Sequence, residues 1–267
     1  MKKRDCSIGF IGFGRMGSIL GSALVESGCA RPGEIVVFEK DRRKRRILKQ
    51  FALADSAQEV VDRAKVIFVC VRPLEVREVA KSIVIKKNTI IISIAAGVNL
   101  AMLQRMFGRS VMRVIPSYTQ KALSGVLLYC HAKGLSRQSV GEILKLLKCI
   151  GEPIQVPEKL LEIATDLSSC SPAFWAFMAD TFVREATRLG LSNVLAQRIT
   201  TMAMLGTSKI LVQESHLERV IDHVATPGGI TREGIEALEK EFPHTVKEIF
   251  RVTGKKYALL RKRIERL

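Results

Sequence analysis

The feature that most constrains the fold is a glycine-rich turn directly after an apolar run near the N-terminus. Residues 7–18 read S-I-G-F-I-G-F-G-R-M-G-S, which contains the spacing G-x-G-x-x-G. Gly12 permits a tight turn, Gly14 lets the backbone approach a pyrophosphate, and Gly17 lets the next helix pack on the strand. Free N–H groups at the start of that helix would face the anion. The predicted cofactor contacts of this loop are Gly12, Gly14, Arg15, Met16 and Gly17.

Apolar strands and helical segments alternate after the turn, a pattern typical of an α/β domain. The continuous apolar runs at 66–71 and 89–95 indicate parallel strands buried on both faces. We therefore predict a Rossmann-type, doubly wound, mostly parallel sheet in a domain spanning residues 1–156. The other predicted strands lie at 34–38, 111–115, 125–131 and 153–156, and the predicted helices include a basic one from about residue 40 to 51.

Beyond residue 157 only helical periodicity remains, which predicts an all-helical C-terminal domain at 157–267. The segment 193–213 is apolar on most faces, and a helix of a monomer would not expose such a surface. We therefore expect it to be buried in a dimer interface. The predicted helices lie at 160–166, 173–189, 193–213, 216–225, 230–240 and 245–264.

The chain has 43 Lys and Arg against 26 Asp and Glu, a net charge of +17. The basic residues gather at 40–49 and 255–266, without interleaved aromatics or a nucleic-acid-binding motif. We interpret the C-terminal block as a solvated helix face and do not expect nucleic acid as a partner. No apolar run approaches the roughly 18 residues that span a bilayer, so we expect no membrane contact and a cytoplasmic protein.

The six cysteines are scattered without a C-x-x-C pair, and the four histidines are dispersed. We interpret the cysteines as buried free thiols and predict no metal site. The cysteines are Cys6, Cys29, Cys70, Cys130, Cys149 and Cys170.

The end of the second strand carries the residues that separate NAD from NADP. A carboxylate there accepts from the ribose 2′-OH, and Glu39 is a candidate. Arg42 and Arg43 follow at once, and guanidinium groups suit a 2′-phosphate. We therefore predict NADPH as the cofactor, with NADH as the alternative.

Small residues and a proline lie at the tips of two later strands, where they would leave room for a flat ring. One reading is a wall on the nicotinamide side of the site; the other is a pair of ordinary strand-ending turns. The residues concerned are Val71, Arg72, Pro73, Ala95 and Ala96.

A second glycine-containing loop, T-P-G-G-I-T at 226–231, precedes a helix. Its bare N–H groups would favour a carboxylate or phosphate. The same spacing also suits an ordinary helix cap by Thr226 or Thr231, so the pattern leaves both interpretations open.

Three motifs in register resemble the pyrroline-5-carboxylate reductase family. They are G-F-I-G-F-G-R-M-G at 9–17, S-S-C-S-P-A-F at 168–174 and the 226–231 loop, and the resemblance covers essentially the whole chain. It implies NADPH-dependent reduction of 1-pyrroline-5-carboxylate to proline, and a helical domain that interlocks two subunits, with active sites between them. The assembly implied is a homodimer or a higher homo-oligomer such as a decamer.

The resemblance also implies roles for residues of the second domain. The 226–231 loop would bind the substrate carboxylate through backbone N–H groups and Thr226, and Thr231 would hydrogen-bond the ring nitrogen. Glu214 would sit near that nitrogen. The substrate contacts implied are Thr226, Gly228, Gly229 and Ser168, and the catalytic residues implied are Thr231 and Glu214.

Some positions depart from the family pattern. Residues 115–119 read I-P-S-Y-T where the family has M-P-N-T-P, and Ser169 and Phe174 replace a glycine and a tyrosine. These features resemble the ComER-type branch of late-competence proteins. Two alternatives therefore stand: a reductase acting on another imine or small keto acid, and a non-catalytic NADP-binding regulator that contacts nucleic acid through its basic faces.

Overall fold

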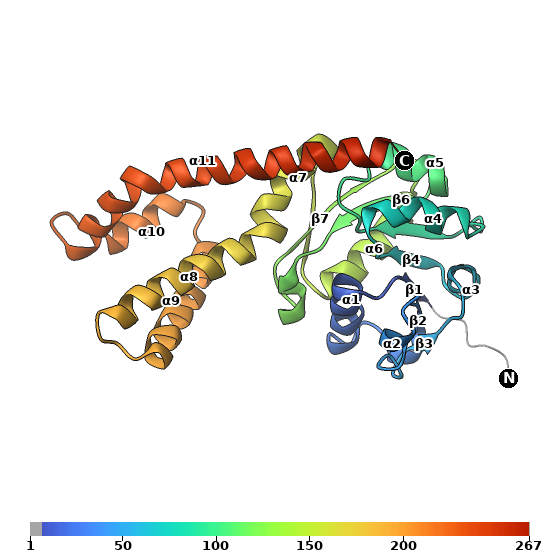
Figure 1. Cartoon of the computed structure of the whole chain (residues 1–267), viewed down its shortest axis with the longest axis horizontal. Helices are drawn as coiled ribbons and strands as arrows, with labels where there is room; N and C mark the ends of the chain where they lie inside the picture. The colour runs from blue at the N-terminus through green and yellow to red at the C-terminus, as the bar shows by residue number, and fades with distance from the viewer. Residues whose placement is uncertain (1–6, 267) are drawn as a thin grey trace. The chain divides into compact units, whose positions relative to one another are not determined.

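The computed structural model describes residues 7–266 and divides into two compact units (Figure 1). The first contains the chain up to Cys170 together with the segment from Gly254 onward, and the second is Ser171–Thr253. The division into domains at residue 156 stays a prediction.

An eight-stranded sheet forms the centre of the first unit, in the order β3-β2-β1-β4-β5-β6-β7-β8. Neighbouring strands are parallel except for β6 and β7, which run antiparallel. The predicted doubly wound, mostly parallel sheet is thereby confirmed, and the order changes direction between β1 and β4. The strands are β1 Ile8–Ile11, β2 Ile35–Phe38, β3 Ala52–Leu53, β4 Val66–Val69, β5 Ile90–Ser93, β6 Val111–Ile115, β7 Val126–His131 and β8 Glu152–Gln155.

Helices cover both faces of the sheet because successive strand residues point to opposite sides. Phe10 of β1 packs in a cluster with α1 and α6, and the next residue, Ile11, packs in a cluster with α3, α4 and α5. The helices of this unit are α1 Arg15–Glu26, α2 Arg42–Arg45, α3 Ala57–Arg63, α4 Val76–Lys81, α5 Leu100–Phe107, α6 Arg137–Lys148 and α7 Leu161–Thr165.

The basic helix expected to reach about residue 51 ends at Arg45 instead. Turn hydrogen bonds follow it, from Leu48 N–H to the Arg45 carbonyl and from Phe51 N–H to the Leu48 carbonyl. These turns bury Leu48 and Phe51 in the cluster that contains Phe10. Burial of the two apolar side chains explains why the helix stops early.

The second unit is helical and contains α8 Ser171–Arg188, α9 Asn193–Gln213 and α10 Leu217–Val224. The two helices predicted at 230–240 and 245–264 are one helix, α11 Ile230–Glu265. Pro243 lies inside it. A proline lacks the N–H that would bond to the Glu239 carbonyl, and its ring crowds that carbonyl, yet the helix continues on both sides.

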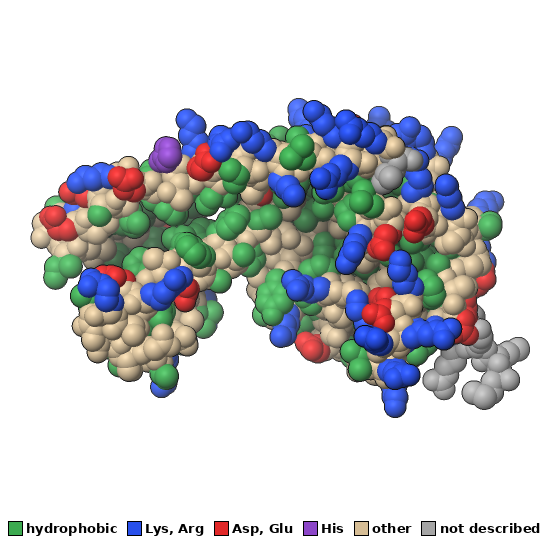
Figure 2. All heavy atoms as spheres, viewed as in Figure 1, with side chains coloured by type: hydrophobic (Ala, Val, Ile, Leu, Met, Phe, Trp, Pro, Cys, Tyr) green, Lys and Arg blue, Asp and Glu red, His purple; other side chains and the backbone are tan. Residues whose placement is uncertain are grey.

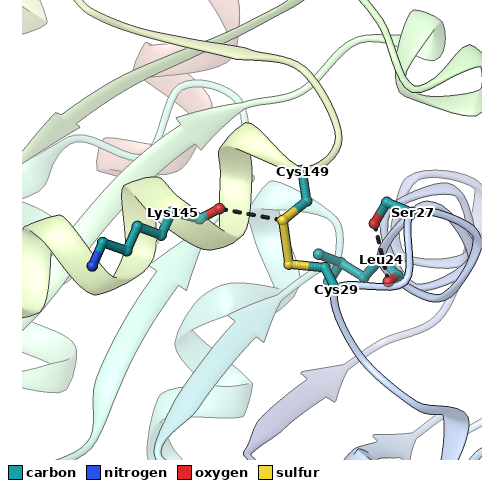
Figure 3. The surroundings of a disulfide bond; sticks show 5 residues. All are labelled: Leu24, Ser27, Cys29, Lys145 and Cys149. Carbon is teal, nitrogen blue, oxygen red and sulfur yellow. Dashed lines mark hydrogen bonds between the residues drawn. A yellow bond between two sulfur atoms is a disulfide. The ribbon is translucent and has the colours of Figure 1, made fainter.

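A disulfide links Cys29 to Cys149, with the two Cα atoms 6.2 Å apart (Figure 3). The prediction of free thiols was therefore wrong for these two residues. Cys29 follows α1, Cys149 follows α6, and both pack against the same apolar cluster, which brings together residues 120 positions apart. Cys70, Cys130 and Cys170 are free, and Cys6 lies outside the described residues.

Within residues 7–266, no helix is long and apolar enough to cross a membrane. Within the same range, no group of three or more His, Cys, Asp or Glu side chains could hold a metal ion.

Candidate functional site

The glycine loop between β1 and α1 has the geometry of an anion cradle. Gly12 has a φ of +83°, and a Cβ there would meet the Val71 side chain at 2.8 Å. A Cβ on Gly17 would lie 2.8 Å from the Gly12 carbonyl oxygen, whereas one on Gly14 would meet nothing within 4 Å. Gly14 also begins α1 without any side-chain cap. The loop therefore leaves bare N–H groups and open space at the helix start, which fits a pyrophosphate.

The carboxylate of Glu39 anchors this loop from the end of β2. Glu39 is 7% exposed, and its Oε2 accepts a hydrogen bond from the Phe13 N–H at 2.8 Å. Its Oε1 accepts another from the Asp41 N–H at 3.0 Å. Both carboxylate oxygens are thus bound to backbone groups of the protein. The side chain that the sequence offers for a ribose 2′-OH instead holds two turns together.

Arg42 and Arg43 are exposed in the first turn of α2, which begins one residue after Asp41. Asp41 caps the helix by accepting from the Arg43 N–H at 2.9 Å. Among residues 7–266 neither guanidinium forms an ion pair, whereas Arg45 at the end of α2 is paired with Asp55 at 2.8 Å. The two arginines therefore stand at the end of β2 with their charges available to a phosphate.

The predicted wall residues fall in two different places. Ala96, after β5, lines a cavity of about 260 Å³ together with Met16 at the start of α1. Pro73 lines another cavity, of about 230 Å³, with residues of α4, α5 and the end of α11. Arg72 is exposed, and its N–H donates to Glu75 at 3.1 Å in an ordinary strand-ending turn. Val71 contacts the glycine loop, and Ala95 is buried beside Ala96.

The cavity at Met16 and Ala96 lies where β1, β5 and β6 end, the edge at which open α/β sheets bind ligands. Apolar groups form most of its wall, including Ile94, Ile115 and Pro116. Polar groups come from α7, from the π-helical turn Asp166–Cys170 and from α11. The cavity can therefore accept a flat ring that carries a polar group.

Ser117 stands where the family pattern has asparagine. It is 1% exposed, and its N–H is hydrogen-bonded to the Gln120 side chain. Its hydroxyl accepts from the Thr119 N–H at 3.4 Å. The serine is thus used inside its own turn, while Pro116 before it lines the cavity.

Sequence reasoning missed the cavity residues Tyr257, Cys170, Thr165 and Arg113. Tyr257 lies on α11, which we interpreted only as a basic, solvated face. Figure 2 shows Lys and Arg side chains along this part of α11, and the block at 255–263 is exposed apart from Tyr257 and its apolar neighbours. The available signal was the helical spacing of Tyr257 from Leu260 and Ile264, two apolar residues that pack in the cluster containing Ile11.

The 226–231 segment belongs to the second unit: residues 226–229 form a tight turn, and Ile230 and Thr231 begin α11. The Gly229 N–H donates to the Thr226 carbonyl at 3.0 Å, and Gly228 has a φ of +72°. A Cβ on Gly229 would lie 2.9 Å from the Thr226 hydroxyl. Thr226 and Thr231 are exposed. Both glycines are therefore required by the turn, and the two hydroxyls are accessible.

Glu214 and Ser168 are placed in separate parts of the chain. Glu214 ends α9, accepts from the His216 N–H at 3.2 Å and lies 3.7 Å from Arg219. Ser168 belongs to the first unit, and its hydroxyl donates to the Ala164 carbonyl at 3.0 Å. Its neighbour Ser169 lines the cavity and donates to the Pro116 carbonyl at 2.9 Å.

Two family models match separate parts of the chain. Residues 158–260 match the model for pyrroline-5-carboxylate reductase dimerisation. Residues 7–97 match the model for NADP oxidoreductase, coenzyme F420-dependent.

Curated relatives match over nearly the full length. The chain is 30% identical to pyrroline-5-carboxylate reductase 3 of Bacillus subtilis, over 96% of this chain and 97% of that protein. It is equally 30% identical to ComE operon protein 4 of the same organism, over 94% of each chain. Identity to the pyrroline-5-carboxylate reductase of Escherichia coli is 30%, over 88% of this chain and 90% of that protein.

Solved structures share the fold. The pyrroline carboxylate reductase of Plasmodium falciparum, solved with NADP bound, superposes with a TM-score of 0.86 at 22% identity, covering 97% and 99% of the two chains. The 1-pyrroline-5-carboxylate reductase of Streptococcus pyogenes gives 0.84 at 24% identity, covering 94% and 97%. The fold, the 30% identity over most of the chain and the matched dimerisation region agree with the motifs. The chain belongs to the pyrroline-5-carboxylate reductase family of NAD(P)-dependent oxidoreductases.

Proposed function

We propose that the protein reduces 1-pyrroline-5-carboxylate to proline with NADPH, in the cytoplasm. The observation that carries the proposal is the cavity shared by Met16 and Ala96, at the sheet edge beside the glycine loop. It offers an apolar wall for a ring next to a cradle for a pyrophosphate. Full-length identity to pyrroline-5-carboxylate reductases supports the choice of substrate.

The residues of the first unit would hold the cofactor. The N–H groups at the start of α1 would bind the pyrophosphate, with Gly12, Gly14 and Gly17 leaving the space that it needs. Arg42 and Arg43 would bind the 2′-phosphate, since Glu39 has both carboxylate oxygens bound elsewhere. Because Arg42 and Arg43 would bind a 2′-phosphate and Glu39 supports the loop, we propose NADPH rather than NADH as the cofactor.

The residues of the second unit would hold the substrate. The backbone N–H of Gly228 and the hydroxyl of Thr226 would bind its carboxylate. Gly229, whose N–H donates to the Thr226 carbonyl, would hold the turn that presents them. Thr231 would hydrogen-bond the ring nitrogen, near Glu214, and Ser168 of the first unit would be a further substrate contact. We propose these roles from the resemblance of the motifs and from the accessible hydroxyls of the loop.

The reaction requires orientation more than acid catalysis. Bound NADPH supplies a hydride to the carbon of the C=N bond. A cyclic imine is protonated near neutral pH, so the protein must hold the ring close to the nicotinamide and fix its carboxylate. A site made of hydroxyls and backbone amides is sufficient for this.

We further propose that the protein acts as a homodimer or a higher homo-oligomer. Apolar side chains of α8 and α9 are at the surface of the chain (Figure 2), among them Phe177, Phe182, Ile199, Met202 and Val212. An exposed apolar surface of this kind marks an interface. The matched dimerisation region contains both helices. Light scattering that shows a monomer at low salt would contradict the proposal.

The full-length similarity to ComE operon protein 4 favours a second candidate, a reductase for another imine or small keto acid. The turn at Ser117, where the family pattern has asparagine, agrees with this second candidate. A turnover screen separates the candidates: NADPH and NADH are each tested with 1-pyrroline-5-carboxylate, other cyclic imines and small keto acids. Oxidation of NADPH only with 1-pyrroline-5-carboxylate supports the first. A preference for another substrate supports the second.

A regulator without turnover is the third alternative. It would be stabilised against heat by NADPH but would oxidise it with none of these substrates. A salt-sensitive gel shift on random DNA would then test whether its basic faces bind phosphate.

A further inference from the structure

Tyr257 is one of the polar residues that line the cavity shared by Met16 and Ala96. It is half-buried on α11, and its hydroxyl donates to Asp166 Oδ1 at 3.3 Å. The Cys170 sulfur lies 3.7 Å from the same hydroxyl. Asp166 is 4% exposed, so the carboxylate stands behind the tyrosine and away from solvent.

The Tyr257 hydroxyl is neutral in this setting. Burial raises its pKa, and the neighbouring Cys170 and Asp166 raise it further. Burial likewise raises the pKa of the Cys170 thiol. Because the phenol proton is directed at Asp166, the Cys170 thiol is the donor in the 3.7 Å contact, and the tyrosine oxygen keeps one further lone pair for a ligand and has no proton to give.

The other hydroxyls of the cavity likewise donate their protons to groups of the protein. Thr165 donates to the Leu161 carbonyl at 2.6 Å, and Ser169 donates to the Pro116 carbonyl at 2.9 Å. Of the two charged side chains of the wall, Glu162 lies 3.6 Å from Arg261. Arg113 lies 2.7 Å from Glu158 through Nη1, whereas its buried Nε has no partner among the described residues. The hydroxyls of the cavity therefore present acceptor oxygens to a ligand, and Arg113 Nε is an unpaired donor in the same wall.

We propose that the Tyr257 oxygen accepts a hydrogen bond from an N–H group of the bound ligand, either the protonated ring nitrogen of the imine or the carboxamide of the nicotinamide. The inference deepens the proposed function and rests on it for the identity of the imine. Asp166 is the positioning residue, because it turns the phenol proton away from the cavity.

The first arm of the test measures recognition of a ring N–H without turnover. L-Proline and tetrahydrofuran-2-carboxylate have nearly the same shape, but only proline carries N–H donors on the ring. Calorimetry on the protein loaded with NADP⁺ gives the affinity of each. A hydrogen bond to a charged group corresponds to roughly 10–100-fold in affinity. We expect the wild type to prefer proline by about this factor and Tyr257→Phe to lose the preference.

The second arm tests the carboxamide. NADPH and 2′-phospho-ADP-ribose share the adenosine half, but only NADPH carries the nicotinamide. If the carboxamide is the donor, Tyr257→Phe weakens NADPH by roughly 5–10-fold, as for a neutral hydrogen bond, and leaves 2′-phospho-ADP-ribose unchanged. Tyr129→Phe is the matched control, since Tyr129 is a buried tyrosine of β7 that does not line this cavity.

Asp166→Asn keeps an acceptor for the phenol proton and removes the charge. We expect a smaller loss of the same preference than in Tyr257→Phe, because the phenol stays oriented. An equal loss for both compounds of a pair, in either variant, would show a packing role and would overturn the inference.

The inference fails if Tyr257→Phe changes neither the preference for proline over tetrahydrofuran-2-carboxylate nor the preference for NADPH over 2′-phospho-ADP-ribose. It also fails if neither proline nor its analogue binds and the preference for NADPH is the same in the variant and the wild type. Failure of the proposed function is a separate result, because it is seen as absence of turnover with 1-pyrroline-5-carboxylate in the wild type. A wild type without turnover whose NADPH preference still depends on Tyr257 supports the inference and rejects that substrate.

Discussion

The Glu39 carboxylate accepts a hydrogen bond from the Phe13 N–H at 2.8 Å and so ties the end of β2 to the middle of the glycine loop. The two residues are 26 positions apart, and both are buried. A carboxylate at this point of a dinucleotide fold is usually considered as a ribose ligand. Here it is a support for the loop, and this difference can be measured.

Glu39→Ala should weaken NADPH and NADH by the same factor, because both carry the pyrophosphate that the loop would hold. Loss of a buried acceptor leaves the Phe13 N–H without a partner, at a cost of about 1–3 kcal/mol in the free energy of unfolding. Calorimetric titration and urea unfolding check both effects, with exposed Glu78→Ala as control. A selective loss of NADH affinity would instead identify Glu39 as a ribose ligand.

Replacement of Arg42 and Arg43 by alanine should lower the affinity for NADPH by roughly 10–100-fold, since charge-assisted hydrogen bonds to the 2′-phosphate are lost. Affinity for NADH should stay within about twofold of the wild type. Titration with each cofactor checks this. Lys44→Ala is the matched control, because Lys44 is an exposed cation in the same helix. Equal effects on the two cofactors would exclude these arginines from the 2′-phosphate site.

Thr231→Ala should lower turnover of 1-pyrroline-5-carboxylate by roughly 10–100-fold and leave the dissociation constant of NADPH unchanged. The reason is that the hydroxyl would contact the ring nitrogen and not the cofactor. Steady-state kinetics and calorimetry give the two quantities. Thr245→Ala, whose hydroxyl bonds to the Glu241 carbonyl in the same helix, should behave as the wild type. Unchanged turnover in Thr231→Ala would remove this residue from the mechanism.

Cys29→Ser should lower the free energy of unfolding by about 2–4 kcal/mol, because the disulfide to Cys149 closes a long loop of the unfolded chain. Urea unfolding without reductant checks the loss. A reductant should lower the stability of the wild type toward that of the variant and should not change the variant. If the two proteins unfold alike without reductant, the disulfide contributes no stability.

The free energy of unfolding should fall as the pH rises from 9 to 11, more steeply in the wild type than in Cys130→Ala. Burial raises the pKa of the Cys130 thiol from about 9 to about 11, so its contribution is complete below pH 9 and is lost as the pH passes 11. Since each pKa unit corresponds to about 1.4 kcal/mol, the curves should converge by about 2–3 kcal/mol. Urea unfolding across this range tests it, and parallel curves would contradict the assignment.

The elements that the sequence predicts well are those set by neighbouring residues. The strand, glycine turn and helix at 8–26 follow from local spacing and agree with the structure. The parallel sheet follows from continuous apolar runs such as 66–69. The helix boundary at Arg45 could not be predicted, because burial of Phe51 in a distant cluster decides it.

The parts that escaped prediction depend on contacts between distant residues. Tyr257 meets Asp166 across 91 positions, and Cys29 meets Cys149 across 120. The residues around Tyr257 and around Cys29 form no local pattern that identifies Asp166 or Cys149 as the partner. Pro243 would ordinarily end a helix, yet α11 continues through it. The candidate site was therefore predictable at its glycine loop and not at the cavity residues of α11 and the turn Asp166–Cys170.

The disulfide also has a topological consequence. The bond between Cys29 and Cys149 makes residues 29–149 a covalent ring, which contains strands β2 to β7. The glycine loop and β1 precede the ring, and β8, the cavity turn at Asp166–Cys170 and all of α8 to α11 follow it. A single cut of the backbone inside the ring would leave one covalently connected molecule, in which the end of the chain that carries the glycine loop is still joined to the helical end.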